Sequence, residues 1–301
     1  MSLDPFEIVG FAKARALAPE DIHPYDQKAN GMLAGEGCGI VVLAREEYAR
    51  KLGYKIHALI RGWGYSSDGT GGITSPEIEG QMRALNNAYK RAGYPISDVE
   101  LFEGHGTGTT LGDKVEITAL RRSIEQSGKN GICRIGSIKA NIGHCKAAAG
   151  IAGFIKVVMA LNRKVLPPTV NCKVPNAAFG DETDGLVPNL QGQPWLKNGA
   201  KPRRASVSSM GFGGANSHIT LEESNPESKP LKKELRLLHS HQDSELILIS
   251  GETSQDLIEK IEHLIPISER ICRAELTDVS AALLKKLIPE KLRVAIIAPS
   301  P

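Results

Sequence analysis

Residues 99–128, "VELFEGHGTGTTLGDKVEITALRRSIEQSG", place a β-rich run before a glycine- and threonine-rich turn around His105 and a helical pattern after it. The same order returns over residues 133–164, where "CRIGSIK" indicates a strand and "HCKAAAGIAGFIKVVMALNRK" a helix. Pro167 and Pro168 then stop that helix. Strand, glycine-rich turn and helix in repetition predict an α/β layered fold, whose functional loops lie at the ends of the strands.

Three further elements are expected upstream of this stretch. Residues 39–44 ("GIVVLA") and 55–64 ("KIHALIRGWG") are β-rich and are predicted to be strands. Residues 75–93 predict an amphipathic helix, which Ser75 can cap and Gly93 can close.

The character of the sequence changes after Glu223. The polar, proline-containing stretch "SNPESKPLKKE" is followed by "ELILIS", "SQDLIEKIEHLI", "ELTDVSAALLKKL" and "RVAIIA", an αβ pattern without glycine-rich chemistry. The sequence therefore predicts two parts: residues 1–223, and a linker with a small αβ subdomain over residues 224–301.

Composition excludes several classes of protein. The net charge of +3 is spread along the 301 residues, so no basic stripe indicates nucleic-acid binding. The five cysteines are odd in number and form no C-x-x-C pair, which argues against a disulfide framework and favours a reducing, cytoplasmic setting.

The first residues, "MSLDPFEIVGF", do not resemble a signal peptide. The longest apolar stretch contains Lys156 and is too short to span a bilayer, so no membrane is expected.

The turn around His105 fits three kinds of site. A phosphate-binding loop would need G-x-x-x-x-G-K-[ST] or G-x-G-x-x-G, and "EGHGTGTTLGD" satisfies neither. A metal site needs converging ligands, whereas His105, His144 and His218 lie each in a separate glycine-rich turn; only a long-range site of all three stays open, and no metal is predicted. The third kind is a catalytic site, because each of these turns puts a polar side chain just beyond a predicted strand, where glycines let the backbone approach a ligand closely.

Three segments taken together resemble the C-terminal motifs of the β-ketoacyl synthases, the decarboxylating condensing enzymes of fatty acid and polyketide synthesis. They are "EGHGTGTTLGD", "GSIKANIGHCKAAAG" and "SSMGFGGANSH". The resemblance covers about residues 1–223, including "HPYDQKANGMLAGEGCGIVVL", and implies the C-terminal half of a thiolase-like layered fold. The remaining residues resemble the subdomain that joins ketosynthase to acyltransferase in type I modular or iterative polyketide synthases. The start of the chain, with "DPFEIVGFAKARAL", is most similar to iterative synthases of the enediyne kind.

The resemblance implies a specific chemistry. A condensing enzyme of this family carries an acyl chain on a cysteine, decarboxylates a malonyl thioester on the phosphopantetheine arm of an acyl carrier protein, and joins the resulting enolate to the acyl group. By motif position His105 and His144 are the family's two histidines, whose N–H groups would stabilise the enolate oxygen. Lys139 matches the active-site lysine, although a surface role at a strand end stays open. No directly bound cofactor is implied.

Supporting roles follow from the same motifs. Glu116 matches the glutamate that the family places near the lysine, and it also stands three residues after Asp113, so that "DKVE" fits a capping box. Thr107 and Thr109 belong to the "HGTGT" motif, and Asn141 is expected to tie its turn together.

The segment "GFGGANSH" is implied to form a gating loop. The backbone N–H of Phe212, between Gly211 and Gly213, corresponds to an oxyanion-hole donor for acyl transfer, and the Phe212 ring would gate the acyl pocket. His218 is expected to be structural and bonded within its own turn.

No nucleophile is expected in this chain. The family's cysteine lies in a T-A-C-S-S type turn well upstream of these motifs, and no such turn is present. Cys38 is expected to be packed. Cys145 stands at a helix start beside a histidine, a position that would lower the pKa of a thiol. It is not expected to be the nucleophile, because adjacent helical residues point about 100° apart and Cys145 and His144 cannot both face one substrate. The isolated chain is therefore expected to be inactive and to expose an apolar surface.

The implied partners are an acyl carrier protein, an adjacent acyltransferase domain and, for the complete ketosynthase, a second copy in a homodimer. The alternative is a non-catalytic, ketosynthase-like scaffold that binds a carrier protein or another protein chain. The intact set of His105, Lys139 and His144 favours the enzyme.

Overall fold

The computed structural model of the chain describes residues 4–69, 76–128, 131–181, 185–196, 201–224, 244–268, 271, 273–288 and 292–299. The chain divides into two units. The first unit comprises Met1–Asn162, Leu166–Gly192 and Arg203–Ser224, and the second comprises Arg163–Val165, Gln193–Pro202 and Asn225–Pro301. Ser75, residues 225–243 and Cys272 fall outside the described residues.

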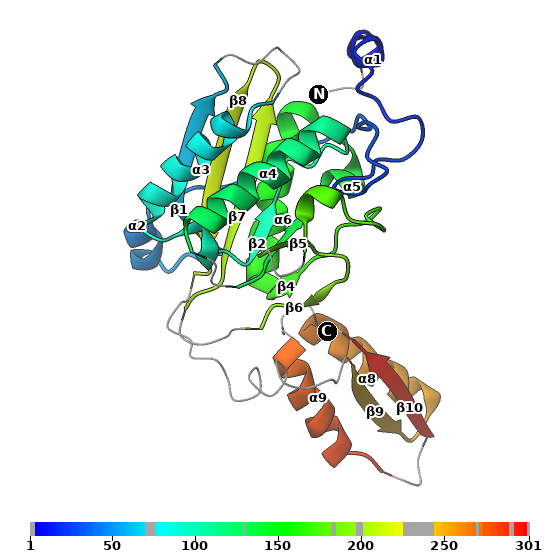
Figure 1. The fold of residues 1–301 in the computed structure, drawn as a ribbon. Coiled ribbons are helices and arrows are strands. Elements are labelled where there is room, and N and C mark those ends of the chain that lie inside the picture. Colours follow the sequence, from blue (N-terminus) through cyan, green and yellow to red (C-terminus); the bar gives the residue numbers. More distant parts are fainter. Residues whose placement is uncertain are drawn as a thin grey trace. The chain divides into compact units, whose positions relative to one another are not determined.

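A six-stranded sheet forms the centre of the first unit (Figure 1). Its strands lie in the order β1 (Leu59–Ser67), β8 (Ala215–Glu222), β7 (Arg204–Gly211), β2 (Leu101–Glu103), β3 (Cys133–Gly136) and β5 (Leu186–Pro188). The pairs β1/β8 and β8/β7 are antiparallel, whereas β7, β2, β3 and β5 run parallel. The short strand β2 is buried throughout, as expected of a parallel strand covered on both faces.

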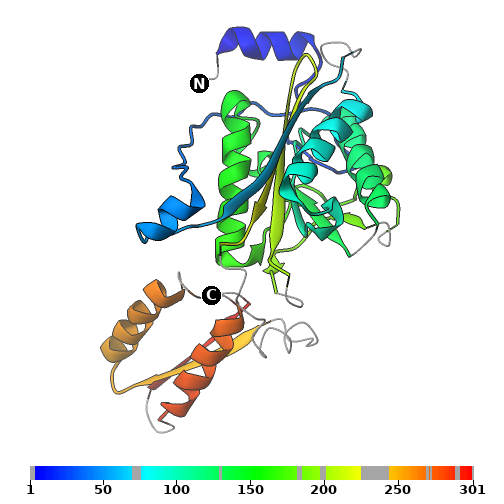
Figure 2. The same ribbon diagram turned by 90° about the vertical axis from the view of Figure 1, so that its left-hand side faces the viewer.

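Helices cover both faces of this sheet. Helices α3 (Ile78–Ala92) and α4 (Thr110–Gln126) lie on one face, and α6 (Ala149–Arg163) lies on the other (Figure 2). The layers approach closely: a Cβ atom at Gly64 in β1 would stand 2.0 Å from the carbonyl oxygen of Ala84 in α3. The layered α/β arrangement that the sequence predicts is confirmed for this unit.

The core between α3, α4 and the sheet is continuous. Its buried apolar residues include Leu85 and Tyr89 of α3, Ile117 and Leu120 of α4, and Phe102 of β2. Helix α3 ends at Gly93 in a left-handed conformation (φ 75°), as the sequence predicts. Burial of these side chains fixes the distance between the helices and the strand ends, where the polar turns lie.

Two short helical turns precede α6. The predicted helix over residues 144–164 is shorter than expected, because a 3-10 turn, η2 (Lys146–Ala148), comes before α6. The four-residue helix α5 (Lys139–Ile142) stands between β3 and His144, with Gly143 at φ 71° ending it. The chain thus turns sharply here, which frees His144 from a regular helix.

The prediction of a strand over residues 39–44 is wrong for the described residues. This segment pairs with no strand, and Ile40 and Val42 are 90% and 94% exposed. Cys38, expected to be packed, is exposed too. A strand forms only where a neighbouring strand accepts its hydrogen bonds, and such a partner is not found in the described part of the chain. The result is a run of exposed apolar side chains, in line with the apolar surface that the sequence predicts.

Other elements of the first unit lie outside the sheet. Helix α1 (Pro5–Lys13) is capped by Asp4, whose Oδ1 accepts the N–H of Phe6 at 2.8 Å. Helix α2 (Glu46–Lys51) precedes β1. The 3-10 helices η1 (Ile96–Asp98) and η3 (Ala177–Phe179) complete the connections. The strand pair of β4 (Val165–Leu166) and β6 (Gln193–Pro194) belongs mainly to the second unit.

The second unit has its own small core. Strands β9 (Glu245–Gly251) and β10 (Leu292–Ala298) form an antiparallel ribbon, accompanied by helices α8 (Ser254–Ser268) and α9 (Arg273–Lys285). Ile247, Ile249, Leu257 and Leu276 pack together there. Across the described residues, none of the helices has both the length and the apolarity that crossing a bilayer requires.

Candidate active site

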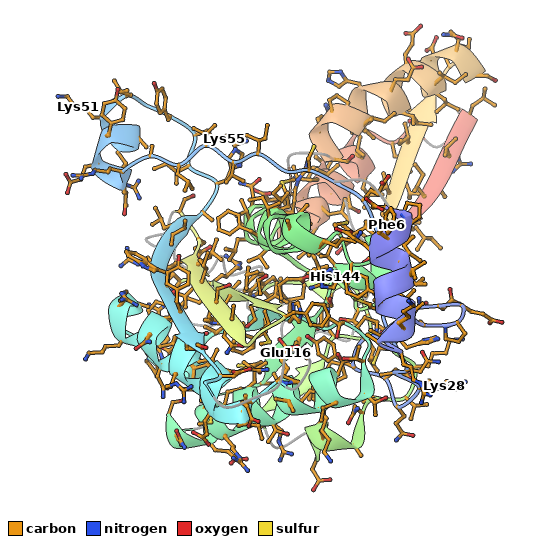
Figure 3. The ribbon with its side chains drawn as sticks, turned by 90° about the horizontal axis from the view of Figure 1, so that it is seen from above. Phe6, Lys28, Lys51, Lys55, Glu116 and His144 are labelled. Carbon is orange, nitrogen blue, oxygen red and sulfur yellow. The ribbon has the colours of Figure 1, made fainter. Side chains whose placement is uncertain are left out.

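Three neighbouring parallel strands bring the predicted site together. The strands lie in the order β7, β2, β3: the carboxyl end of β7 contains Met210, and the carboxyl ends of β2 and β3 lead into His105 and Lys139. Parallel strands end at the same edge of a sheet, so turns that are far apart in sequence become neighbours there. The site therefore follows from topology, and Figure 3 labels two of its residues, Glu116 and His144, in the view from above.

The two histidines lie close to each other. Their ring centroids are 5.5 Å apart and their planes are almost perpendicular, at 84°. The backbone N–H of Met210 donates to Nδ1 of His105 at 3.3 Å, and the backbone N–H of Lys146 donates to Nδ1 of His144 at 2.9 Å. A neutral imidazole whose Nδ1 accepts a hydrogen bond carries its proton on Nε2. Both rings thus present an Nε2–H donor.

The surroundings keep both rings neutral. Burial lowers the pKa of His105 well below its ordinary value, and the charge of Lys139 and the neighbouring His144 add to the shift. Burial also lowers the pKa of His144 to about 4, again with a contribution from Lys139. At neutral pH the pair therefore acts as two uncharged hydrogen-bond donors rather than as acids.

A segment far upstream positions His144. The backbone N–H of His144 donates to the carbonyl of Leu33 at 2.7 Å, and the N–H of Gly35 donates to the carbonyl of His144 at 3.1 Å. A Cβ atom at Gly35 would stand 2.1 Å from the carbonyl oxygen of Ile142, so only glycine fits this contact. The "LAGEG" segment thus holds the histidine turn by its backbone.

The Glu116 carboxylate holds the turn of His105. Its Oε1 accepts the backbone N–H of His105 at 2.7 Å, and its Oε2 accepts the N–H of Gly106 at 2.9 Å and the hydroxyl of Tyr25 at 3.0 Å. Asp113, one helical turn earlier, accepts the backbone N–H groups of Tyr25 and Gly108. Burial raises the pKa of Glu116, and it raises that of Asp113 to about 7.

These contacts correct the capping-box prediction. Helix α4 begins at Thr110, with Thr109 as its N-cap, so Asp113 and Glu116 both lie inside the helix. Their carboxylates bind backbone N–H groups of the histidine turn and of Tyr25 instead of the N-terminus of their own helix. Glu116 therefore supports the site and does not close a capping box.

Lys139 lies at the centre of this buried network. Only 3% of the residue is exposed, and its Nζ donates to the backbone carbonyl of His105. Burial lowers the pKa of Lys139, while the nearby carboxylates of Glu103, Glu116 and Asp113 oppose that shift. The interpretation of Lys139 as a surface residue is wrong, because the side chain is enclosed among acceptors.

A largely buried ion pair adjoins the lysine. Glu103, at the end of β2, accepts the ammonium of Lys156 at 2.6 Å through Oε2 and the backbone N–H of Ile138 at 2.5 Å through Oε1. Sequence reasoning missed both side chains. The signal was a lysine inside the apolar pattern of the helix after His144, since a charge on a buried helix face needs a partner.

The remaining predicted residues lie around the same turns. The hydroxyls of Thr107 and Thr109 are 2.9 Å apart. The side chain of Asn141 is exposed and makes no hydrogen bond within the described residues. Its expected role in its turn stays a prediction.

The glycine-rich loop after β7 is a hairpin turn. Gly211 ends β7, β8 begins at Ala215, and Gly213 adopts a left-handed conformation at φ 82°. The Phe212 ring is 56% exposed and lies against the ring of Phe11 in α1, with 5.7 Å between centroids. The gating role of this loop stays a prediction.

Two family models match the chain. Residues 57–173 match "Beta-ketoacyl synthase, C-terminal domain", and residues 1–49 match "Beta-ketoacyl synthase, N-terminal domain". The chain belongs to the β-ketoacyl synthase family. The matched ranges contain His105, Lys139 and His144.

Curated relatives of this β-ketoacyl synthase chain are large synthases. A polyunsaturated fatty acid synthase of a Thraustochytrium species is 41% identical over 91% of this chain and 10% of its own length. "Polyketide synthase PksL" of Bacillus subtilis is 39% identical over 84% of this chain and 6% of its own length. The chain thus spans a tenth or less of these relatives.

Solved ketosynthase structures share the fold. The ketosynthase from module 6 of the Bacillus subtilis bacillaene synthase superposes with a TM-score of 0.73 at 34% identity, covering 99% of this chain and 51% of its own. A ketosynthase domain of Streptomyces albus oxazolomycin synthesis also gives a TM-score of 0.73, at 28% identity, with 52% of its length covered. The chain has the mixed α/β, thiolase-like fold of ketosynthases and spans about half of each of these domains.

The three buried cysteines among the described residues of this ketosynthase chain are not activated thiols. Cys145 is buried, and burial raises its pKa. Burial also raises the pKa of Cys133 and of Cys172 to about 12. Cys38 is exposed on the unpaired segment described above.

His218 is a structural residue of the core, but its partners differ from the prediction. Its Nδ1 pairs with the hydroxyl of Ser208 on β7 at 2.9 Å, and its Nε2 pairs with the hydroxyl of Tyr89 on α3 at 3.1 Å. The prediction that His218 bonds within its own turn is wrong. Successive side chains of a β-strand point to opposite faces of the sheet, and that of His218 points to the face that α3 covers.

We expect His218 to make stability depend on pH. Burial lowers its pKa to about 3, below the 6.5 of an unfolded histidine, so its contribution is present above pH 6.5 and is lost as the pH falls towards 3. The loss amounts to about 1.4 kcal/mol per pH unit. Denaturant unfolding measures the free energy of unfolding of the parent chain and of His218→Gln between pH 7 and pH 4. In the variant this free energy should fall less steeply with decreasing pH, by about 1.4 kcal/mol per pH unit. The exposed His57→Gln variant is the control, and an equal change in both variants would contradict the assignment.

Proposed function

We propose that residues 1–223 supply the enolate-stabilising part of a β-ketoacyl-[acyl-carrier-protein] synthase, which performs decarboxylative Claisen condensation in polyketide or fatty acid synthesis. The observation that carries this proposal is the pair of Nε2–H donors on His105 and His144, both fixed by backbone hydrogen bonds to Nδ1. Membership of the β-ketoacyl synthase family supports it.

The proposed reaction has two steps. In the first, the bond between the malonyl carboxylate and its α-carbon breaks, CO₂ leaves, and the electron pair forms an enolate of the thioester. In the second, the enolate carbon attacks the carbonyl carbon of the enzyme-bound acyl thioester, a carbon–carbon bond forms, and the cysteine thiolate leaves. The difficult species is the enolate, because negative charge develops on the thioester oxygen.

Two neutral donors suit this charge. A preorganised donor to a developing oxyanion is worth about 2.7–4 kcal/mol. His105 and His144 would donate to the enolate oxygen, and because both are neutral they need no proton transfer to do so. Lys139 and Glu116 hold the His105 turn from opposite sides of its backbone, through the carbonyl and the N–H of His105. Both act on the position of the ring and not on the substrate.

The partners are part of this proposal. We infer that the malonyl group arrives on the phosphopantetheine arm of an acyl carrier protein, and that the complete ketosynthase is a homodimer beside an acyltransferase domain. The likeness to polyketide and polyunsaturated fatty acid synthases supports this setting. The separate core of β9, β10, α8 and α9 supports a linker subdomain within residues 224–301.

The proposal places the nucleophilic cysteine outside these residues, and acylation tests this. Intact-mass spectrometry of the chain after exposure to an acyl-pantetheine thioester should show no stable acyl adduct on Cys145, because its thiol is buried with a raised pKa. Cys38→Ser removes the exposed thiol and serves as the control for non-specific labelling. A stoichiometric adduct on Cys145, located by peptide mapping and still formed in the Cys38→Ser variant, would mean that the chain is an acyltransferase in its own right.

A further inference from the structure

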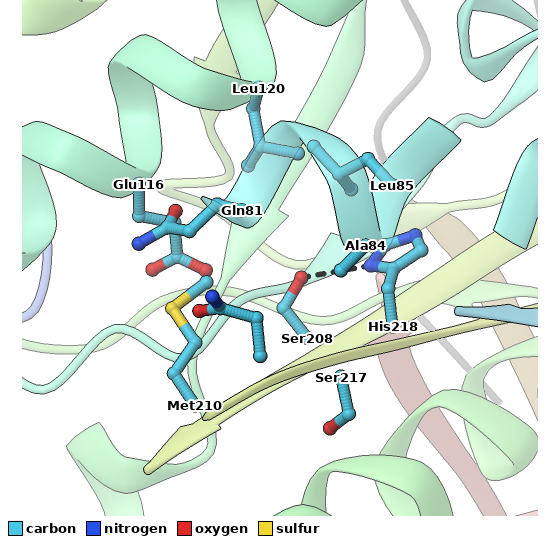
Figure 4. Close-up of a pocket in the computed structure, with 10 residues that line it drawn as sticks. Gln81, Ala84, Leu85, Glu116, Leu120, Ser208, Met210, Ser217 and His218 are labelled. Atoms are coloured by element: carbon cyan, nitrogen blue, oxygen red, sulfur yellow. Dashed lines mark hydrogen bonds between the residues drawn. The ribbon is translucent and has the colours of Figure 1, made fainter. Parts of the chain in front are cut away.

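A small pocket lies beside the Glu116 carboxylate, on the face of the sheet that α3 and α4 cover (Figure 4). Its wall combines residues of α3, α4 and the β7–β8 hairpin, among them Gln81, Glu116, Leu120, Ser208 and Met210. The cavity volume is about 10 Å³. That is close to the minimum that one ordered water needs.

Gln81 is the unexplained residue of this wall. It is 2% exposed, and neither Nε2 nor Oε1 of its side chain has a hydrogen-bond partner in the described structure. A buried amide without partners destabilises a fold, and buried polar groups are almost always satisfied by protein or by ordered water. Because both of its side-chain atoms lack protein partners at the edge of a pocket, water is the ligand that fits.

The Glu116 carboxylate can accept one further hydrogen bond, from a water that also contacts Gln81. Its carboxylate oxygens accept three hydrogen bonds, from the N–H groups of His105 and Gly106 and from the hydroxyl of Tyr25. An ionised carboxylate offers about four acceptor positions. Gln81 and Glu116 line the same pocket without a direct hydrogen bond between them.

We propose that one water molecule binds in this pocket, accepts a hydrogen bond from Nε2 of Gln81 and donates one to the carboxylate of Glu116. Gln81 is then a positioning residue: it steadies the carboxylate that holds the backbone of His105. The second proton of the water is donated to Oε1 of Gln81, so that the same water serves both unpartnered atoms of the amide. The consequence for catalysis rests on the proposed function, whereas the water site does not.

The pocket can be examined directly in the full chain. A crystal structure at a resolution that orders internal water should show one water within hydrogen-bond distance of both Gln81 and Glu116. An empty pocket, or a direct hydrogen bond between the two side chains, would overturn the proposal.

A near-isosteric variant tests the link to Glu116. In Gln81→Met the water loses its donor, so the ionised form of Glu116 loses support and its pKa should rise, measured by ¹³C NMR of the Glu116 carboxyl in the full chain. The groups that face this carboxylate, Tyr25, Asp113 and Lys139, are unchanged in the variant. Asn86→Leu, which replaces an exposed amide of the same helix, is the matched control and should leave the titration unchanged.

The rate of malonyl-thioester decarboxylation is a second test of the role of Gln81. In a complete ketosynthase that contains these residues, Gln81→Met should lower kcat for malonyl-thioester decarboxylation by up to about 10²-fold with an unchanged KM, because a displacement of about 1 Å in a catalytic group can cost that much. If the parent ketosynthase proves inactive, the proposed function fails, while the bound water and the Glu116 titration still decide the role of Gln81. An unaltered pKa of Glu116 in the Gln81→Met chain would refute the positioning role of Gln81.

Discussion

In a complete ketosynthase that contains these residues, His144→Ala should lower the rate of malonyl-thioester decarboxylation by a factor of about 10²–10³. The variant removes one of the two Nε2–H donors while leaving the other, on His105, fixed by the N–H of Met210. Loss of one oxyanion donor costs about 2.7–4 kcal/mol of transition-state stabilisation, which is the basis of that factor. The measurement is release of ¹⁴CO₂ from labelled malonyl carrier protein at saturating substrate, so that the change falls on kcat.

Two comparisons sharpen this test. His144→Asn keeps an N–H donor on a shorter side chain and should retain more activity than His144→Ala. His57→Ala changes an exposed histidine outside the site and should have no effect. A non-catalytic scaffold would release no CO₂ in any of these variants, and equal rates for the parent and His144→Ala would reject the enolate-stabilising role.

The place of the candidate site in the fold could be predicted because its residues stand in compact motifs. His105, Lys139 and Phe212 each follow a strand, and strands β2, β3 and β7 turn out to be neighbours in the parallel part of the sheet. Family resemblance supplied the pairing of the two histidines, which no local pattern contains. The structure adds what motifs cannot give, namely that backbone N–H groups of Met210 and Lys146 fix the tautomer of both rings.

The features that the sequence did not predict correctly have physical reasons. The partner of Lys156 is Glu103, on a strand 53 positions away, and sequence spacing gives no indication of such a contact. Asp113 and Glu116 matched a capping box by spacing, but their carboxylates accept backbone N–H groups of Tyr25 and of the histidine turn instead. Residues 39–44 have the composition of a strand, yet a strand also requires a neighbour, and composition does not encode one.

Replacing Lys139 with methionine should destabilise the first unit by about 3–5 kcal/mol, the usual cost of removing one partner from a buried charge network. The side chain is 3% exposed and donates to the carbonyl of His105, and its charge balances Glu103, Glu116 and Asp113. Without the ammonium, three buried carboxylates remain near a turn that has lost its cation. Denaturant unfolding of the full chain, followed by a probe in the first unit, measures the change.

The dependence of this loss on pH distinguishes charge from packing. In Lys139→Met the pKa values of Asp113, already about 7, and of Glu116 should rise further, so the native variant binds more protons than the unfolded chain near neutrality. Stability then falls as the pH rises, and the deficit relative to the parent should be larger at pH 8 than at pH 5. Lys156→Met, which breaks the neighbouring pair with Glu103, is the comparison, because it leaves the contact with the His105 carbonyl intact. A deficit that is the same at both pH values would show that Lys139 stabilises the turn by packing alone, and the lysine would then have no electrostatic part in holding His105.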